Sequence, residues 1–243
     1  MAAEYSRRLS CVRQFRALKT IVYSQSSRAE RITDRSMTLS PPQPPAPSVR
    51  GFLHDHEGQQ LYDWALEAAL LGPLLEIGSY CGRSTIWLGQ AARARNTVVL
   101  AVDHHRGSEE HQPGESHHDQ DLVDASGQFN TFNEFRSNIE AARISEAVIP
   151  IVCGSDALAA HWCGDLGMVF IDGGHSLDAA LTDYRAWATR IRPGGILAIH
   201  DVFPDPADGG QAPYTIWQLA AQSGLFEPLG TTDTLRGLRR LQP

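Results

Sequence analysis

The feature of this sequence that most constrains its fold is a regular alternation of short apolar runs with helical segments after Gly51. Each apolar run is roughly five residues long, the usual length of a buried strand. The runs lie within 73–79, 97–103, 148–156, 166–174 and 196–202. Segments with helical periodicity separate them, at 59–72, 84–95, 132–143 and 176–191, the last closed by RPGG. This alternation predicts βαβ units and a parallel sheet covered by helices on both faces.

The C-terminal part follows a different pattern. A helical segment at 214–224 precedes FEPLGTTDTLRGLRRL, residues 226–241, which has two strand-like runs around a turn. Such a pair predicts an antiparallel hairpin at a sheet edge. We therefore expect an α/β protein with a Rossmann-like, doubly wound, mostly parallel seven-stranded sheet and a C-terminal antiparallel hairpin.

Residues 1–50 differ in composition from the rest. They carry nine basic and three acidic side chains and end in the proline-rich stretch LSPPQPPAPSV. Proline favours extended backbone and cannot propagate a helix. We expect residues 1–50 to form a disordered basic extension, followed by one domain over 51–243. A transit peptide, or an upstream extension with the working start at Met37, remains an alternative.

Composition excludes several functions. The formal net charge of −7 gives no electrostatic basis for binding nucleic acid. No apolar run approaches the roughly 20 residues that span a bilayer, and the N-terminus lacks the apolar core of a signal peptide. The four cysteines form no CxxC pair that would indicate a structural zinc site. We expect a cytoplasmic protein without a nucleic-acid or membrane partner.

Acidic side chains stand at or beside the ends of the expected strands. In doubly wound sheets, ligands bind beyond the carboxyl ends of the strands. Gly78 and Gly82 follow the first strand, but Tyr80 replaces the glycine that would let a dinucleotide pyrophosphate approach. Asp103, at the end of the second strand, can accept hydrogen bonds from ribose hydroxyls. The pattern favours a nucleoside without a phosphate cradle; the alternative is simple helix–strand packing.

The motifs LLEIGSYCGRST, AVD, CGSDAL, FIDGGHS and RPGGILAIHD resemble, in this order, those of class I S-adenosylmethionine-dependent methyltransferases. The nearest branch is that of the macrocin-type sugar O-methyltransferases, methyltransferase domain family 24. The resemblance covers residue 51 to the end and implies S-adenosylmethionine as cofactor and a homodimer. Glu76, Gly78 and Gly82 would line its methionine end, Asp103 would hold its ribose, and the 154–156 turn would flank its adenine. The implied cofactor-binding residues are Glu76, Gly78, Ser79, Gly82, Ser84, Asp103, Gly154, Ser155 and Asp156.

The resemblance also implies a metal site at two further strand ends. Metal-dependent O-methyltransferases of this fold hold Mg²⁺ there, and the corresponding residues are Asp172, His200 and Asp201, with Mg²⁺ or another divalent cation as the ion. His175 is the candidate general base, beside Asp172 in the catalytic group. The catechol-type pattern ends in Asp-Asn where this chain has His-Asp, so His200 either ligates the metal or orients Asp201. The structural alternatives are a helix N-cap for Asp172 and a core histidine for His200.

The stretch DHHRGSEEHQPGESHHDQD, residues 103–121, holds five histidines and six carboxylates and lacks periodicity. We expect an acceptor-binding loop; a solvated loop or a zinc cluster is the alternative. Its polar character favours a sugar hydroxyl, on an oligosaccharide or a small glycoside, as the methyl acceptor. A catechol or phenol is a second option. The small number of aromatic residues in these loops argues against it. A nucleotide-dependent oxidoreductase and a non-catalytic binding module are options from other classes.

Overall fold

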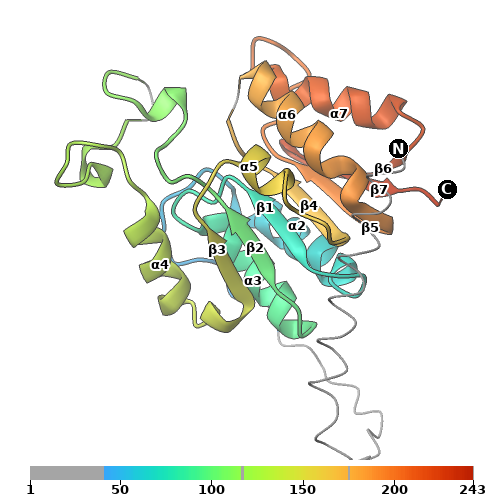
Figure 1. The fold of residues 1–243 in the computed structure, drawn as a ribbon, viewed down its shortest axis with the longest axis horizontal. Coiled ribbons are helices and arrows are strands. Elements are labelled where there is room, and N and C mark those ends of the chain that lie inside the picture. Colours follow the sequence, from blue (N-terminus) through green and yellow to red (C-terminus); the bar gives the residue numbers. More distant parts are fainter. Residues whose placement is uncertain (1–40, 116–117, 175, 243) are drawn as a thin grey trace, which may run out of the picture. The chain divides into compact units, whose positions relative to one another are not determined.

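The computed structural model describes residues 41–115, 118–174 and 176–242 of the chain. Within the unit that begins at Pro41, seven strands form one sheet in the order β3-β2-β1-β4-β5-β7-β6 (Figure 1). The strands are β1 Leu74–Ile77, β2 Val99–Val102, β3 Val148–Ile151, β4 Leu166–Ile171, β5 Ile191–Ile199, β6 Phe226–Thr232 and β7 Leu235–Arg240. The first five are parallel, and β7 pairs antiparallel with both β5 and β6. The predicted fold class is confirmed.

Helices cover both faces of this sheet (Figure 1). They are α2 Asp55–Ala68, α3 Arg83–Ala94, α4 Phe132–Ala141, α5 Ser155–Ala159, α6 Leu177–Trp187 and α7 Ala212–Gln222. Along β1, Leu75 and Ile77 pack in the cluster that holds α6 and α7, whereas Leu74 packs in the cluster with α2 and α3. Successive side chains of a strand point to opposite faces, so every apolar residue of β1 is buried.

The segment between α6 and β5 differs from the sequence expectation. We predicted that RPGG, residues 192–195, would close a helix that extends to Ile191. Instead α6 ends at Trp187, a 3₁₀ turn follows at Ala188–Arg190, and RPGG lies inside β5. The β4–β5 register shifts here, between Leu166 and Met168. Gly194 has φ +83°, a left-handed conformation that favours glycine, so the strand begins with an irregularity.

Residues 41–50, which the sequence assigns to the extension, contact the domain where the structure describes them. Gln43 exchanges two hydrogen bonds with the Gln90 side chain on α3. Arg50 forms ion pairs with Asp119 at 2.9 Å, with Asp121 at 3.1 Å and with Glu134 at 2.5 Å. The prediction of disorder for residues 1–40 lies outside the described residues. No helix in the described part is both long and apolar enough to cross a membrane.

The turn after β1 brings two strand ends into backbone contact. Gly78 has φ +85°, and a Cβ atom there would lie 2.1 Å from the carbonyl oxygen of Asp172, after β4. Only glycine allows both this conformation and this approach. Gly82, at φ +92°, is the N-cap of α3. The two glycines predicted from the sequence therefore shape the turn at the carboxyl edge of the sheet.

We expect Gly78→Ala to lower the free energy of unfolding by about 3 kcal/mol, because it combines left-handed strain with a steric overlap. Urea denaturation would measure the loss. Gly114→Ala is a matched control, since Gly114 also has a positive φ, +95°, but among the described residues no heavy atom beyond its two chain neighbours lies within 4 Å of the position that a Cβ atom would take there. The control should cost only about 1 kcal/mol. Equal losses in the two variants would contradict the close approach as the cause.

Candidate functional site

A cavity of about 1070 Å³ opens at the carboxyl ends of the parallel strands. Its lining includes the turn after β1 and Asp103, and also Asp172 and Asp201. Nine of the sequence-predicted site residues line it: Gly78, Ser79, Ser84, Asp103, Gly154, Ser155, Asp156, Asp172 and Asp201. Glu76, Gly82 and His200 lie behind its wall. His175, the candidate base, lies outside the described residues.

Asp103 fixes the shape of the turn after β1. Its Oδ2 accepts hydrogen bonds from the backbone amides of Ser79 and Tyr80, at 2.9 and 2.8 Å. Its Oδ1 accepts from the amide of His105 at 2.7 Å. A carboxylate offers about four lone-pair positions, so one remains for a ligand. Asp103 is therefore both an anchor of the turn and a wall residue of the cavity.

Glu76 supports the same turn from beneath. Its carboxyl is fully buried and accepts hydrogen bonds from the hydroxyls of Ser84, at 2.6 Å, and Thr85, at 2.5 Å. Burial raises the pKa of Glu76 to about 7, against the opposing effect of these hydroxyl donors. Because both hydroxyls belong to the first turn of α3, Glu76 ties the start of that helix to β1.

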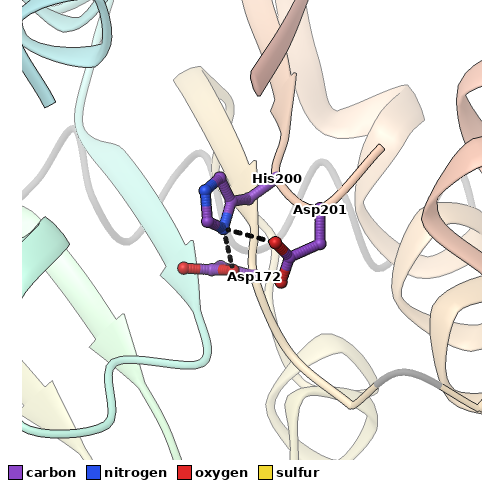
Figure 2. A group of neighbouring side chains, drawn as sticks. All are labelled: Asp172, His200 and Asp201. Carbon is purple, nitrogen blue, oxygen red and sulfur yellow. Dashed lines mark hydrogen bonds and ion pairs between the residues drawn. The ribbon is translucent and has the colours of Figure 1, made fainter. Parts of the chain in front are cut away.

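Asp172, His200 and Asp201 form a compact cluster after β4 and β5 (Figure 2). His200 Nδ1 lies 3.0 Å from Asp172 Oδ1 and 3.5 Å from Asp201 Oδ1. One ligand atom from each of the three residues falls within 4.8 Å of the other two. Asp201 has φ +54°, an unusual conformation for a residue other than glycine. Such local strain is typical of sites where a side chain must be aimed, here toward the cavity.

Glu57 on α2 completes this cluster, and sequence reasoning missed it. Its side chain is 1% exposed, and its Oε2 lies 3.3 Å from His200 Nε2. Its Oε1 accepts hydrogen bonds from the amide and hydroxyl of Thr234, each at 2.9 Å. The position three residues after the N-cap His54 indicates a capping role, which the structure shows. Nothing in the sequence pairs Glu57 with a histidine 143 positions away.

The charges of this cluster depend on one another. Burial by itself would lower the pKa of His200, but the carboxylates of Asp172, Glu57 and Asp201 outweigh it and raise the pKa to about 11. Burial would raise the pKa of Glu57, but the hydrogen bond and charge of His200 hold it at about 2. In the absence of an ion, His200 is thus an imidazolium that donates from both ring nitrogens.

A family model described as a methyltransferase domain matches residues 75–202, more than half of the chain. The chain belongs to the methyltransferase domain family. This confirms the methyltransferase predicted from the motifs, and the match spans both the turn after β1 and the Asp172–His200–Asp201 cluster.

Solved structures share the fold of this methyltransferase. The cofactor-bound protein Rv0187 from MTB has 18% sequence identity and a TM-score of 0.57, covering 80% of this chain and 84% of its own. The O-methyltransferase NovP has 14% identity and a TM-score of 0.58, covering 76% and 79%. TomG from Streptomyces achromogenes, an O-methyltransferase of tomaymycin synthesis solved with SAM, has 16% identity and a TM-score of 0.54, covering 81% and 83%.

Asp183, on α6 of the methyltransferase, is a second site residue that the sequence analysis missed. It is 7% exposed, lines the cavity and accepts a hydrogen bond from the Ser155 hydroxyl. Burial raises its pKa to about 6, against the lowering effect of the Ser155 hydrogen bond. A signal was present: Ala180, Asp183 and Trp187 form the buried stripe of α6, and a carboxylate on such a stripe is unusual.

The loop after β2 forms the outer wall of the cavity. It contains 3₁₀ turns at Glu109–His111 and Gln120–Leu122, and Glu109, Glu110 and Glu115 line the cavity. Rings from three segments meet beside it: Phe52–Tyr80 at 6.0 Å, Tyr80–His111 at 5.2 Å and His111–Phe129 at 5.3 Å between centroids. Within the described residues this loop provides no group of histidines and carboxylates placed to hold zinc.

We expect Asp183→Asn to reduce the pH dependence of the free energy of unfolding between pH 4 and 6. The folded protein binds the Asp183 proton more tightly than the unfolded chain, whose pKa is near 3.8. The stabilisation from Asp183 is complete below pH 3.8 and is lost as the pH rises to about 6, so Asp183 contributes about 3 kcal/mol to the pH dependence of the wild type, in addition to the contribution of Glu76. Urea denaturation across this interval would measure it.

The control is Asp178→Asn, which removes an exposed carboxyl from the same helix. Its unfolding free energy should follow the wild-type pH profile. An Asp183→Asn profile that also parallels wild type would show that the Asp183 carboxyl titrates as it does in water.

Proposed function

We propose that the chain is an S-adenosylmethionine-dependent O-methyltransferase that modifies a sugar hydroxyl with the help of a bound divalent cation. One observation carries this proposal: a single cavity joins the Asp103 turn, suited to a nucleoside, to a pair of carboxylates suited to a hard cation. A methyl donor and an activated acceptor can therefore meet within one cavity.

The cavity fits the cofactor in three respects. Its volume of about 1070 Å³ accommodates a nucleoside and an acceptor together. Asp103 lines the cavity and keeps one lone pair for a ribose hydroxyl, and Ser155, Asp156 and Asp183 also line it and are the residues proposed to flank the adenine. Structural neighbours support the choice, since TomG was solved with SAM and a Bacillus cereus O-methyltransferase with SAH.

The strand-end cluster fits a divalent cation. Asp172 and Asp201 are 20% and 24% exposed at their side chains, so each can present an oxygen to the cavity. An imidazolium at His200 balances their charge, and a cation between the carboxylates would take over that role. Two carboxylates and one imidazole form a donor set that suits a divalent metal ion.

The residues of the chain have separate tasks in the proposed transfer. When bound, S-adenosylmethionine supplies an electrophilic methyl group and the divalent cation supplies positive charge beside the acceptor oxygen. Asp172 and Asp201 fix the acceptor end of the cavity. His175, which lies outside the described residues, is proposed to remove the hydroxyl proton, because a neutral alcohol is a weak nucleophile. Phe52 and residues of the loop after β2 line the cavity at its acceptor side.

A sugar acceptor agrees with the polar lining of the outer wall. Glu109, Glu110, Gln112 and Glu115 line the cavity and offer hydrogen-bond acceptors to hydroxyl groups. Candidates are an oligosaccharide, a polysaccharide such as methylmannose polysaccharide, or a glycosylated natural product. Homodimer formation stays a prediction from the family resemblance.

A catechol or other phenol is the second candidate acceptor, and the structure adds an observation in its favour. Phe52 is 56% exposed at the edge of the cavity, with its ring against Tyr80. An exposed ring in this position can stack on an aromatic acceptor as well as on a sugar. The sequence argument against a phenol considered only the loops and overlooked Phe52, which precedes α2.

We expect S-adenosylhomocysteine to bind the purified protein and raise its melting temperature, whereas NAD should leave it unchanged. Asp103→Asn should weaken S-adenosylhomocysteine binding about tenfold or more, because it removes a charged acceptor from the ribose site. Calorimetric titration would measure both. Glu140→Gln, an exposed carboxyl on α4, is the control and should bind like wild type. Tight binding of NAD would contradict the proposed cofactor.

We expect chelator-treated protein to lose methyl transfer and to regain it on addition of a divalent cation. Asp201→Asn should lower kcat about 100-fold, because the acceptor oxygen is no longer held in line with the methyl group. His175→Ala should also lower kcat by at least about 100-fold. Labelled S-adenosylmethionine, tested against a panel of oligosaccharides and phenols, provides the measurement. Full activity without any divalent cation would remove the metal from the proposal.

A further inference from the structure

The cluster after β4 and β5 is not an all-oxygen site. An imidazole nitrogen, His200 Nδ1, lies between the carboxylates of Asp172 and Asp201, at 3.0 and 3.5 Å (Figure 2). Two donor atoms that bind one cation at right angles, each about 2.1 Å away, lie roughly 3 Å apart. The spacing of His200 Nδ1 from the two carboxylate oxygens therefore fits neighbouring positions around a single cation, and the three donors all lie within 4.8 Å of one another.

Glu57 fixes the orientation of the His200 ring. Its buried carboxylate is held by Thr234 and by the amide of His54, so it cannot turn away from His200 Nε2. A metal-binding histidine usually donates its second ring N–H to such a carboxylate, which selects the tautomer. With the hydrogen on Nε2, the lone pair of Nδ1 points between Asp172 and Asp201.

We infer that this site takes a first-row transition-metal cation such as Co²⁺, Ni²⁺ or Zn²⁺ in preference to Mg²⁺, with His200 Nδ1 as a ligand and Glu57 as the residue that positions it. This inference rests on the proposed function and concerns the nature of its cation. Mg²⁺ prefers oxygen ligands and loses water reluctantly, whereas imidazole suits the later first-row metals. The carboxylates alone would suit either class of ion, so His200 sets the preference.

The selectivity can be measured on the full chain without an affinity tag, after treatment with chelator. Calorimetric titration gives the dissociation constants of Co²⁺ and Mg²⁺. Oxygen sites also favour Co²⁺ to some degree. The informative quantity is therefore how much a substitution changes the Mg²⁺-to-Co²⁺ ratio, defined as the dissociation constant of Mg²⁺ divided by that of Co²⁺. His200→Asp converts the site to oxygen ligands, and we expect the ratio to fall at least tenfold, mainly through weaker Co²⁺ binding.

Glu57→Gln tests the positioning role. The amide it introduces would compete as a donor for His200 Nε2 and shift the ring hydrogen to Nδ1, so Co²⁺ binding should weaken about 10- to 100-fold while Mg²⁺ binding changes less. Glu67→Gln is the matched control: it makes the same change on the same helix, at an exposed carboxyl paired with Arg239. Its two dissociation constants should equal those of wild type.

Pulsed electron paramagnetic resonance of bound Cu²⁺ gives a second readout, which remains decisive if Glu57→Gln fails to fold. Wild type should show the modulation from the remote ring nitrogen of a directly bound imidazole, and His200→Asp should lose it. An unchanged Mg²⁺-to-Co²⁺ ratio in His200→Asp, or nitrogen modulation that survives this substitution, would overturn the inference. S-Adenosylhomocysteine binding, titrated in the same samples, distinguishes failure of the inference from failure of the proposed function. Wild type that does not bind S-adenosylhomocysteine would contradict the proposed function. Wild type that binds it but shows no preference for Co²⁺ would contradict only the inference about the metal.

Discussion

The close passage of the Gly78 backbone against the Asp172 carbonyl holds the site together. Strands β1 and β4 are neighbours in the parallel sheet, and the turn after one touches the residue after the other. A side chain at position 78 would separate them. The backbone amides of the same turn also donate hydrogen bonds to the Asp103 carboxylate, so the turn links Asp103 to Asp172. Side chains then only need to complete a frame that the backbone has already set.

Buried charge in this frame is balanced in two different ways. Around His200, one imidazolium balances three carboxylates. The groups of this cluster come from α2, from the ends of β4 and β5, and from the β6–β7 turn. At Glu76 no cation is near among the described residues, so burial favours the protonated form and hydroxyl groups satisfy the oxygens. The first arrangement suits a site that accepts a positive ion, whereas the second suits a structural support. Similar residues at neighbouring strand ends thus serve different purposes.

Much of this arrangement could be predicted from the sequence, because strand ends in a parallel sheet converge at one edge. That rule by itself places Asp103, Asp172 and Asp201 together. The rule did not find residues that reach the site from helices or from the segment before α2. Glu57 arrives from a helix before the first strand, Asp183 from the buried stripe of α6, and Phe52 from the segment preceding α2. The prediction that RPGG ends a helix was wrong for a local reason: glycines are found after the ends of helices and also where an irregular strand begins.

The ion pairs of Arg50 bear on how a methyltransferase of this kind could change its acceptor. The segment that carries Arg50 lies before the family-matched region, yet it contributes Phe52 to the cavity edge. Its Arg50 pairs with two carboxylates of the loop after β2 and with one carboxylate of α4. These ion pairs are partly exposed to solvent, so dissolved salt weakens them. This edge of the cavity consists of charged and aromatic side chains that lie outside the strands, so a few substitutions could change it without disturbing the sheet. Selection for new acceptors would then change the residues at the edge of the cavity, while the residues at the strand ends stay the same.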